Sequence, residues 1–282
     1  MCRLSCCCRA PKPIPFRADY QRKFAFRTFG GRAHHAMPNA NEENLLLASM
    51  VREDWSLLAD HVKLVDLTQG QILFDQGEDV VRTYFPGLGT IISLMMPLKN
   101  GNVVEVTMIG YEGAAGGVVS AGNKPASARM QVLCEGAAWC LPTAILEDLK
   151  WQSKNLHNIF SRYGDLLLAQ TMQSVACNAN HNIEQRCARW LLAMQDRARN
   201  GHLNITQELL AGLLGVQRTS VSVVAQSLQS RQIIEYSRGR ITIRNRAALH
   251  AVACECYDDV DRHLGAILPD VAAARKTLSP LR

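Results

Sequence analysis

Between residues 63 and 141 the chain alternates short runs of apolar and β-favouring residues with turn residues. Gly, Pro and Asn separate seven such runs, at 63–67, 71–74, 82–85, 90–95, 103–109, 129–134 and 137–141. Short strands at close and regular spacing are typical of an antiparallel sandwich or barrel. A single short helix is predicted before them, because Glu42 and Glu43 precede apolar residues at helical spacing up to Val62.

The pattern changes to a helical period after Thr143. It predicts one long helix from about residue 153 to 176, with Leu156, Ile159, Tyr163 and Leu166 on one nearly heptad-spaced stripe. Such a stripe would be exposed in a monomer, so we expect it to pair with a second copy of the chain across a two-fold axis. A core helix within one chain is the alternative.

Three shorter helices are predicted next, at 183–199, 205–214 and 217–230. The last two are joined by a short turn that contains Gly215, which is the helix-turn-helix pattern. In the second of them, Val221, Val224 and Leu228 share one side and can face a core, which leaves Arg218, Thr219 and Ser222 outward. Small hydroxyl side chains allow close approach to DNA, and an Arg at the start of such a helix can bind guanine with two hydrogen bonds.

A two-stranded hairpin is predicted after the second helix, from 233–235 and 240–244, with Arg238 and Arg240 at its tip. Residues 201–246 carry six Arg against Glu208 and Glu235. A basic hairpin beside a helix-turn-helix is typical of a wing that binds DNA phosphates.

Residues from about 60 to 250 resemble the Crp/Fnr family of bacterial transcription regulators. The stretches that carry the resemblance are LTQGQILFDQGE at 67–78, ITQELLAGLLGVQRTSVSVVAQSL at 205–228 and IIEYSRGRITI at 233–243. The resemblance implies an α+β fold: an N-terminal antiparallel β-roll shaped like a cyclic-nucleotide-binding jelly roll, a long dimerisation helix and a C-terminal winged helix-turn-helix. It also implies a homodimer that binds a palindromic double-stranded DNA operator, with RNA polymerase as a partner.

The corresponding domain boundaries are 37–150 for the sensor, 151–178 for the dimerisation helix, 179–250 for the DNA-binding domain and 251–282 for a helical tail. Residues 1–36 hold eight basic residues and one acid without a hydrophobic period, so they are expected to be disordered or to precede a start at Met37. The rest of the chain is close to neutral. The net charge of +6 is therefore poor evidence for DNA binding.

Carried over by position, the family's base-reading Arg is Arg218, and its backbone-contacting hydroxyls are Thr206 and Ser220. The full predicted DNA-contacting set is Gln217, Arg218, Thr219, Ser220, Ser222, Thr206, Arg238 and Arg240. The cyclic-AMP-responsive branch has an acid where this chain has Thr219 and a second Arg where it has Val223. The operator sequence therefore cannot be transferred.

Cyclic nucleotide binding is not expected. In the stretch GYEGAAGGVVSAGNKPASARM at 110–130, Ala114-Ala115 stands where the family has the ribose-binding Gly-Glu, and Pro125-Ala126 where it has the phosphate-binding Arg-Ser. A buried phosphate without a cation would be poorly compensated, unless Arg129 points inward. The effector, and the choice between activator and repressor, stay open.

Two groups of cysteines are candidate cofactor sites, and neither is expected to bind a cofactor. The oxygen-sensing branch holds an iron–sulfur cluster, for which Cys2, Cys6, Cys7, Cys8 and Cys140 are candidates, but three adjacent cysteines lack the usual spacers and Cys140 falls one strand position too far.

Cys254 and Cys256 with His250 and His263 form a weak zinc pattern. We expect these cysteines, like Cys177 and Cys187, to be small buried apolar side chains. An iron–sulfur or thiol-based redox sensor of the same fold remains an alternative.

Other function classes receive little support from the 282 residues. No apolar run is long enough to cross a membrane, and the absence of a signal-peptide pattern favours a reducing cytoplasm despite ten cysteines. No hydrolase elbow, phosphate-binding Lys loop or zincin motif suggests an enzyme. An interaction module that has lost DNA binding is the remaining alternative, against which Arg218 and the basic hairpin argue.

Overall fold

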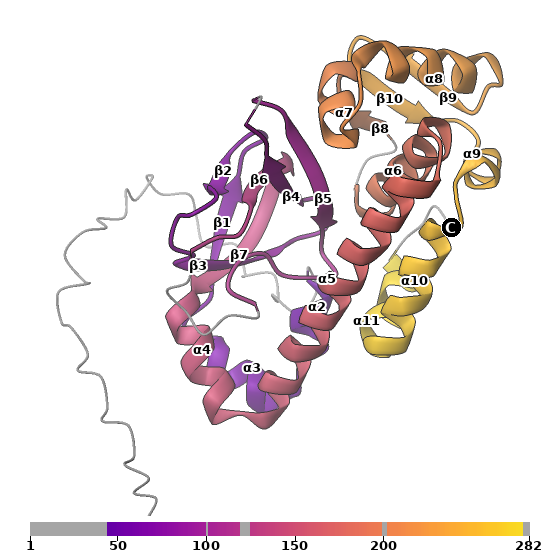
Figure 1. The fold of residues 1–282 in the computed structure, drawn as a ribbon. Coiled ribbons are helices and arrows are strands. Elements are labelled where there is room, and N and C mark those ends of the chain that lie inside the picture. Colours follow the sequence, from indigo (N-terminus) through magenta and orange to yellow (C-terminus); the bar gives the residue numbers. More distant parts are fainter. Residues whose placement is uncertain (1–43, 100, 119–124, 199–201, 279–282) are drawn as a thin grey trace, which may run out of the picture. The chain divides into compact units, whose positions relative to one another are not determined.

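The strands predicted between residues 63 and 141 are present and form a β-roll (Figure 1). The computed structural model describes residues 44–99, 101–118, 125–198 and 202–278. They belong to one compact unit, Pro38–Arg282. The predicted N-terminal tail, with its four cysteines, lies outside the described residues.

Seven strands make two antiparallel sheets in the β-roll. They are β1 (Lys63–Leu67), β2 (Ile72–Phe74), β3 (Arg82–Pro86), β4 (Ile91–Pro97), β5 (Val103–Ile109), β6 (Arg129–Cys134) and β7 (Gly136–Pro142). One sheet has the order β1-β7-β3 and the other β2-β6-β4-β5. Ile92, Ile109 and Val132 are almost fully buried between them. The expected α+β fold with an N-terminal antiparallel β-roll is confirmed.

Two short helices, α2 (Leu45–Ala48) and α3 (Arg52–Leu58), replace the single leading helix that was expected. Three consecutive residues of α2, Leu45 to Leu47, are buried, which a helix lying on the surface could not provide. Asn44 caps α2 by accepting from the Leu47 amide at 3.1 Å, and its side-chain amide donates to Pro86 and Gly113 carbonyls at 2.9 Å. These bonds fix the start of α2 to the β-roll, and the helix ends four residues later at its C-cap Ser49.

Helix α5 (Lys154–Asn180) follows α4 (Thr143–Gln152) after a break at Ser153, whose hydroxyl accepts from the Leu156 amide and so caps α5. The expectation that its predicted stripe is exposed in a single chain is wrong. Leu156, Tyr163 and Leu166 are buried within the chain's own core, and Ile159 is half-buried against it. The Tyr163 hydroxyl also donates to the Ala114 carbonyl at 3.1 Å.

A different face of α5 carries exposed apolar side chains. Leu168, Met172 and Val175 are 59%, 63% and 66% exposed, at spacings of four and three residues. Residues at these spacings lie on one side of a helix. The helix therefore has two apolar faces, of which the described residues cover only one.

Helix α6 (Ile183–Arg197) begins with a capping box between Asn182 and Gln185. Two acids of the β-roll, the half-buried Glu105 and the buried Glu112, bind it. Glu105 accepts from the Trp190 indole at 2.7 Å, and burial raises the pKa of Glu105. Glu112 forms an ion pair with Arg197 at 2.6 Å, in which both side chains are 4% exposed.

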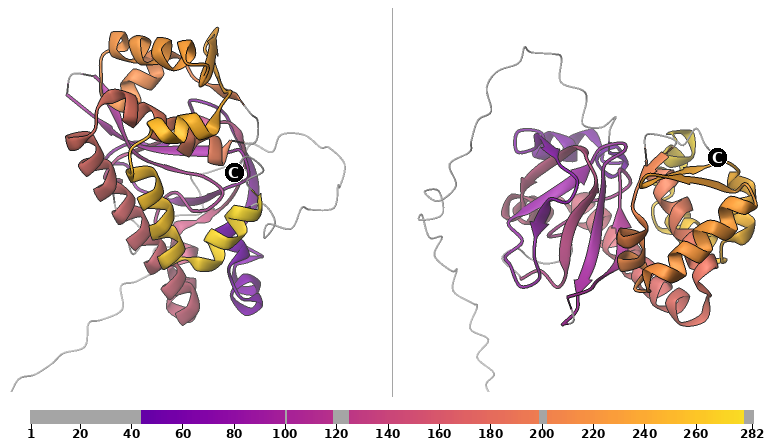
Figure 2. Two further views of the ribbon diagram at one scale, coloured as in Figure 1. Left: turned by 90° about the vertical axis from the view of Figure 1, so that its right-hand side faces the viewer. Right: turned by 90° about the horizontal axis from the view of Figure 1, so that it is seen from above.

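The C-terminal residues form α9 (Arg246–Val252), α10 (Cys256–Ile267) and α11 (Pro269–Leu278). Helix α10 lies beside α5 and α11 (Figure 2). The fully buried Asp196 of α6 holds these helices, since it accepts from Arg246 at 2.7 Å, from Arg275 at 3.1 Å and from the Tyr257 hydroxyl at 2.6 Å. The tail is thus part of the packed structure.

Among the described residues, no helix combines the length and hydropathy needed to span a membrane.

Candidate nucleic-acid interface

Helices α7 (Gln207–Leu214) and α8 (Arg218–Ser230) form the predicted helix-turn-helix. Thr206 caps α7, because its hydroxyl accepts from the Leu209 amide at 3.1 Å. Gly215 ends α7 with φ of +66°, a left-handed conformation in which a Cβ is disfavoured. The chain turns there and starts α8 three residues later.

The two sides of α8 differ as the sequence predicts. Val221, Val224 and Leu228 are buried in the core shared with α6 and α7. Arg218 is the first residue of α8, and its side chain is 67% exposed with a loose ion pair to Glu208 at 3.7 Å. Thr219 is also exposed. The exposed side therefore presents a cation at the helix start, where major-groove readers place their contacts.

Val223 is a further candidate contact, which from the sequence was only a departure from the cyclic-AMP-responsive branch. It lies on the exposed side of α8, 67% accessible. An apolar side chain there can contact the methyl group of thymine. Exposure of a Val between buried Val neighbours is the signal that identifies it.

The predicted hydroxyl contacts occupy different environments. Ser222 is half-buried, and its Oγ lies 2.6 Å from Gln207 Oε1 and 3.0 Å from the Arg218 carbonyl. It was expected to point outward, but it ties α8 to α7 instead. Ser220 is half-buried and Gln217 is exposed at the N-cap of α8.

The predicted wing is present, with one additional strand. Strands β9 (Ile234–Ser237) and β10 (Arg240–Ile243) are joined by Arg238 and Gly239, which both have positive φ, as two-residue hairpin turns require. A third strand, β8 (His202–Asn204), pairs with β10 and was missed because three residues give no readable period. Arg238 and Arg240 are exposed, and Arg240 Nε lies 3.4 Å from Asn204 Oδ1.

The charge of this region is less available than the sequence indicates. Arg231, Arg244 and Arg246 form ion pairs with Glu184, Glu235 and Asp196. Arg218, Arg238 and Arg240 are the exposed arginines at the start of α8 and at the wing. These three are the best placed for contact with a polyanion.

Residues 185–252, which include α7, α8 and the wing, match the Crp-like helix-turn-helix domain family. The chain carries a Crp-like helix-turn-helix domain. Comparison of the sequence with curated proteins gives no match.

Three solved structures resemble the fold over about two thirds of this chain. FixK2 from Bradyrhizobium japonicum is 16% identical with a TM-score of 0.59, over 68% of this chain and 98% of its own. A CRP-family regulator from Thermus thermophilus is 18% identical with a TM-score of 0.56, over 67% and 96%. The c-di-GMP-responsive regulator CLP from Xanthomonas campestris is 13% identical with a TM-score of 0.55, over 68% and 99%. The chain therefore shares the fold of these three structures, in addition to its Crp-like helix-turn-helix domain.

The β-roll that precedes the Crp-like domain contains an apolar cavity of about 260 Å³. It is lined by Ala114, Pro125 and Ala126, three of the residues predicted from the sequence to stand at the family's nucleotide-contact positions, and by Leu167 of α5. Among the described lining residues none is charged. Arg129 is not part of the lining, and its guanidinium instead pairs with Asp75 at 2.6 Å, a contact that lowers the pKa of Asp75.

Cys254 and Cys256, which follow the Crp-like domain, do not meet the histidines proposed for them. His250 Nε2 lies 2.9 Å from Asp258 Oδ1, and His263 is exposed. Both cysteines are buried as expected, beside Cys177 of α5. The sequence suggested His250 and His263 because they are close to these cysteines along the chain. The residues that lie beside the cysteines in the fold are about 75 positions away.

Proposed function

We propose that the protein is a sequence-specific transcription regulator that binds a palindromic operator as a homodimer and acts with RNA polymerase in the cytoplasm. The observation that carries this proposal is the exposed side of α8, where Arg218 extends from the helix start while the opposite side is buried. A rigid helix with one exposed guanidinium, next to an arginine-tipped wing, suits base reading combined with phosphate binding. No step of this role requires catalysis.

A homodimer is supported by the uncovered face of α5. Leu168, Met172 and Val175 are the largest apolar side chains exposed along this helix. An apolar stripe on a long helix is well suited to pack against its own copy, because a two-fold axis places the same stripe on both sides. Two recognition helices brought together in this way would read two half-sites.

Met172→Glu should convert the dimer into a monomer, because the charge would be buried in the contact between two copies of α5. Light scattering after size-exclusion chromatography should then give about half the native mass. Leu64→Glu is the matched control, since Leu64 is an exposed apolar residue on β1, and its mass should not change. A dimer that persists in both Met172→Glu and Leu168→Glu would place the interface elsewhere.

We further propose that neither cyclic AMP nor cyclic GMP is the effector. The cavity of the β-roll is lined by apolar residues, among them Ala114, Ala126 and Leu167. Arg129 forms an ion pair with Asp75. Isothermal titration calorimetry should therefore detect no binding of either nucleotide in the micromolar range. If micromolar binding occurs, its loss in Arg129→Ala would show that this arginine leaves Asp75 to hold the phosphate.

Two experiments test the regulator proposal itself. A gel-shift assay on the promoter region of the protein's own gene should show a complex that resists competition by scrambled DNA. Genome-wide mapping of bound DNA, combined with transcript changes on deletion, would give the operator and the sign of regulation. Failure to retard any mapped fragment would favour an interaction module that has lost DNA binding.

A further inference from the structure

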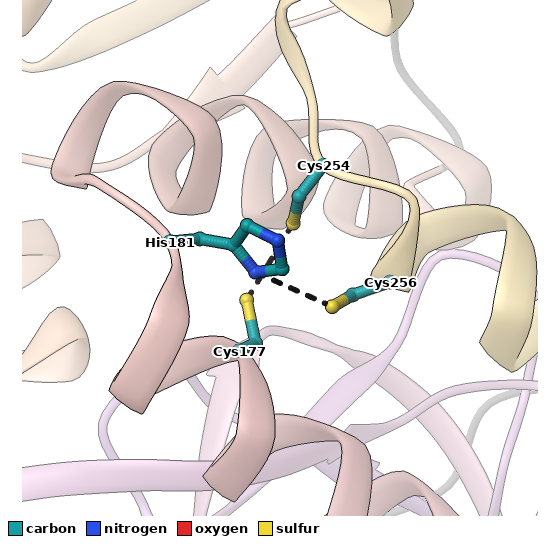
Figure 3. A group of neighbouring side chains, drawn as sticks. All are labelled: Cys177, His181, Cys254 and Cys256. Carbon is teal, nitrogen blue, oxygen red and sulfur yellow. Dashed lines mark hydrogen bonds between the residues drawn. The ribbon is translucent and has the colours of Figure 1, made fainter.

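Four potential metal ligands meet where α5 ends (Figure 3). Cys177 and His181 come from the last turn and the C-cap of α5, Cys254 lies between α9 and α10, and Cys256 is the first residue of α10. Their sulfur and nitrogen atoms all lie within 4.8 Å of one another. The three cysteines are at most 3% exposed, and the His181 side chain is 15% exposed.

The spacing of these atoms is close to that of a tetrahedral zinc site. Zn–S and Zn–N bonds of about 2.3 and 2.0–2.1 Å place two sulfur ligands about 3.8 Å apart and a sulfur and a nitrogen about 3.6 Å apart. Cys177 Sγ lies 3.5 Å from Cys254 Sγ, and Cys256 Sγ lies 3.6 Å from His181 Nδ1. The widest separation in the group would need to close by about 1 Å.

Local structure explains why the four side chains converge. Residues four apart lie on the same side of a helix, so Cys177 and His181 point the same way from the end of α5. Cys254 and Cys256 bracket Glu255, the N-cap of α10, and Ala253 before them is extended. The close packing of α10 on α5 then brings both pairs together.

The surrounding polar groups are those that metal ligands need. Glu255 Oε1 lies 3.2 Å from His181 Nε2, and a carboxylate in this place favours the tautomer with its proton on Nε2. In that tautomer Nδ1, which lies 3.6 Å from Cys256 Sγ, offers its lone pair to a metal ion. The side-chain amide of Gln173 donates to Cys256 Sγ at 3.0 Å, which suits a thiolate. Three thiolates and one Zn²⁺ would carry a net charge of −1, and the cations Arg186 and Arg189 interact electrostatically with Cys177.

We propose that Cys177, His181, Cys254 and Cys256 bind one Zn²⁺ as a closed structural site. Four protein ligands leave no open position for substrate or water, which distinguishes structural from catalytic zinc. The site joins two parts of the chain: the end of α5, with Cys177 and its C-cap His181, and the start of α10 with the residues just before it, at Cys254 and Cys256. Zinc would thereby fix the Crp-like domain to the long helix.

Metal content of the full-length protein, purified with a reductant and without a chelator, tests the proposal. Inductively coupled plasma mass spectrometry should find one zinc per chain. Cys177→Ser and Cys254→Ser should each lose it, whereas Glu255→Gln should keep the site but weaken zinc affinity by about 10–100-fold. Metal-free wild-type protein that takes up no added Zn²⁺ would overturn the proposal.

Two sets of cysteines outside the site serve as controls. Cys187→Ala changes a buried cysteine of α6 that is not part of the group, and it should retain one zinc. A full-length variant with serine at positions 2, 6, 7 and 8 should also retain it. Loss of zinc from this second variant, with none from Cys254→Ser, would assign the metal to the N-terminal cysteines instead.

Cobalt replaces zinc as a spectroscopic probe in case the cysteine variants do not fold. In the chain with serine at positions 2, 6, 7 and 8, Co²⁺ should give the intense visible bands of tetrahedral coordination and a near-ultraviolet thiolate-to-cobalt band. A pale octahedral spectrum would contradict the proposal. So would a Cys177–Cys254 disulfide found by mass spectrometry in freshly purified, reductant-treated protein. None of these readouts depends on DNA binding.

Discussion

Arg218→Ala should weaken binding to a guanine-containing operator by about 1–3 kcal/mol and relax the base preference at one position of each half-site. Arg218 starts α8, its side chain is exposed, and its ion pair with Glu208 is long enough to be exchanged for a base. Its planar group can bind O6 and N7 of guanine together. Fluorescence anisotropy on operator and scrambled duplexes, over a range of salt concentrations, measures both effects.

Arg240→Ala is the matched comparison, because this arginine is exposed on the wing and is expected to bind phosphate. Its loss should weaken binding to all DNA about equally. It should also reduce the slope of log K against the logarithm of the salt concentration by roughly one unit. Arg218→Ala should therefore lower specificity for the operator, whereas Arg240→Ala should lower affinity for all DNA. Equal losses on operator and scrambled duplex for Arg218→Ala would mean that another residue, with Val223 as first candidate, reads the sequence.

The second large effect is expected on the stability of the folded protein. Arg197→Met should lower the free energy of unfolding by about 3–5 kcal/mol, because it leaves the buried carboxylate of Glu112 without its main partner. The pair joins the end of the β-roll to α6, and both side chains are almost fully buried. Urea denaturation at neutral pH, with the wild type alongside, measures the loss.

The double variant Glu112→Gln/Arg197→Met separates a charge effect from a packing effect. Removing the orphaned charge should restore much of the lost stability. If the double variant is no more stable than Arg197→Met alone, the loss comes from packing and the ion-pair explanation is wrong.

Acidification provides a further check on the same pair. Burial alone would raise the pKa of Glu112, but the charges of Arg197 and Arg275 outweigh it, so the pKa lies below its ordinary value. In the wild type the contribution of Glu112 is full above the unfolded-state pKa and is lost as pH falls through the folded-state pKa. Without Arg197 burial opposes ionisation, so the stability difference between wild type and variant should shrink as pH falls.

Elements with a local signal could be predicted from the sequence. The strands of the β-roll could be predicted from alternating residues, the turn at Gly215 from its glycine and the wing from its basic turn. Each of these signals lies within a few adjacent residues. The two sides of α8 followed from the spacing of Val221, Val224 and Leu228. A local pattern of this kind decides which element forms and which side of it is apolar.

The features that were missed depend on contacts between distant segments. Periodicity identified an apolar stripe on α5 but not what covers it, so the buried side with Tyr163 was mistaken for a surface. The sequence showed Cys254 and Cys256 but not that packing of α10 on α5 brings them to Cys177. A cysteine and a histidine four residues apart at the end of a long helix would have been the available clue.

The order of strands in the first sheet constrains how the protein can fold during its synthesis. Strand β1 pairs with β7, so Lys63 lies opposite Cys140, and β3 pairs with the same strand. Neither edge strand has its partner until residue 142 has left the ribosome. At about 5–20 residues per second, the newly made β1 waits seconds without its partner strand, and an unpaired strand offers its backbone N–H and C=O groups to other chains during that interval.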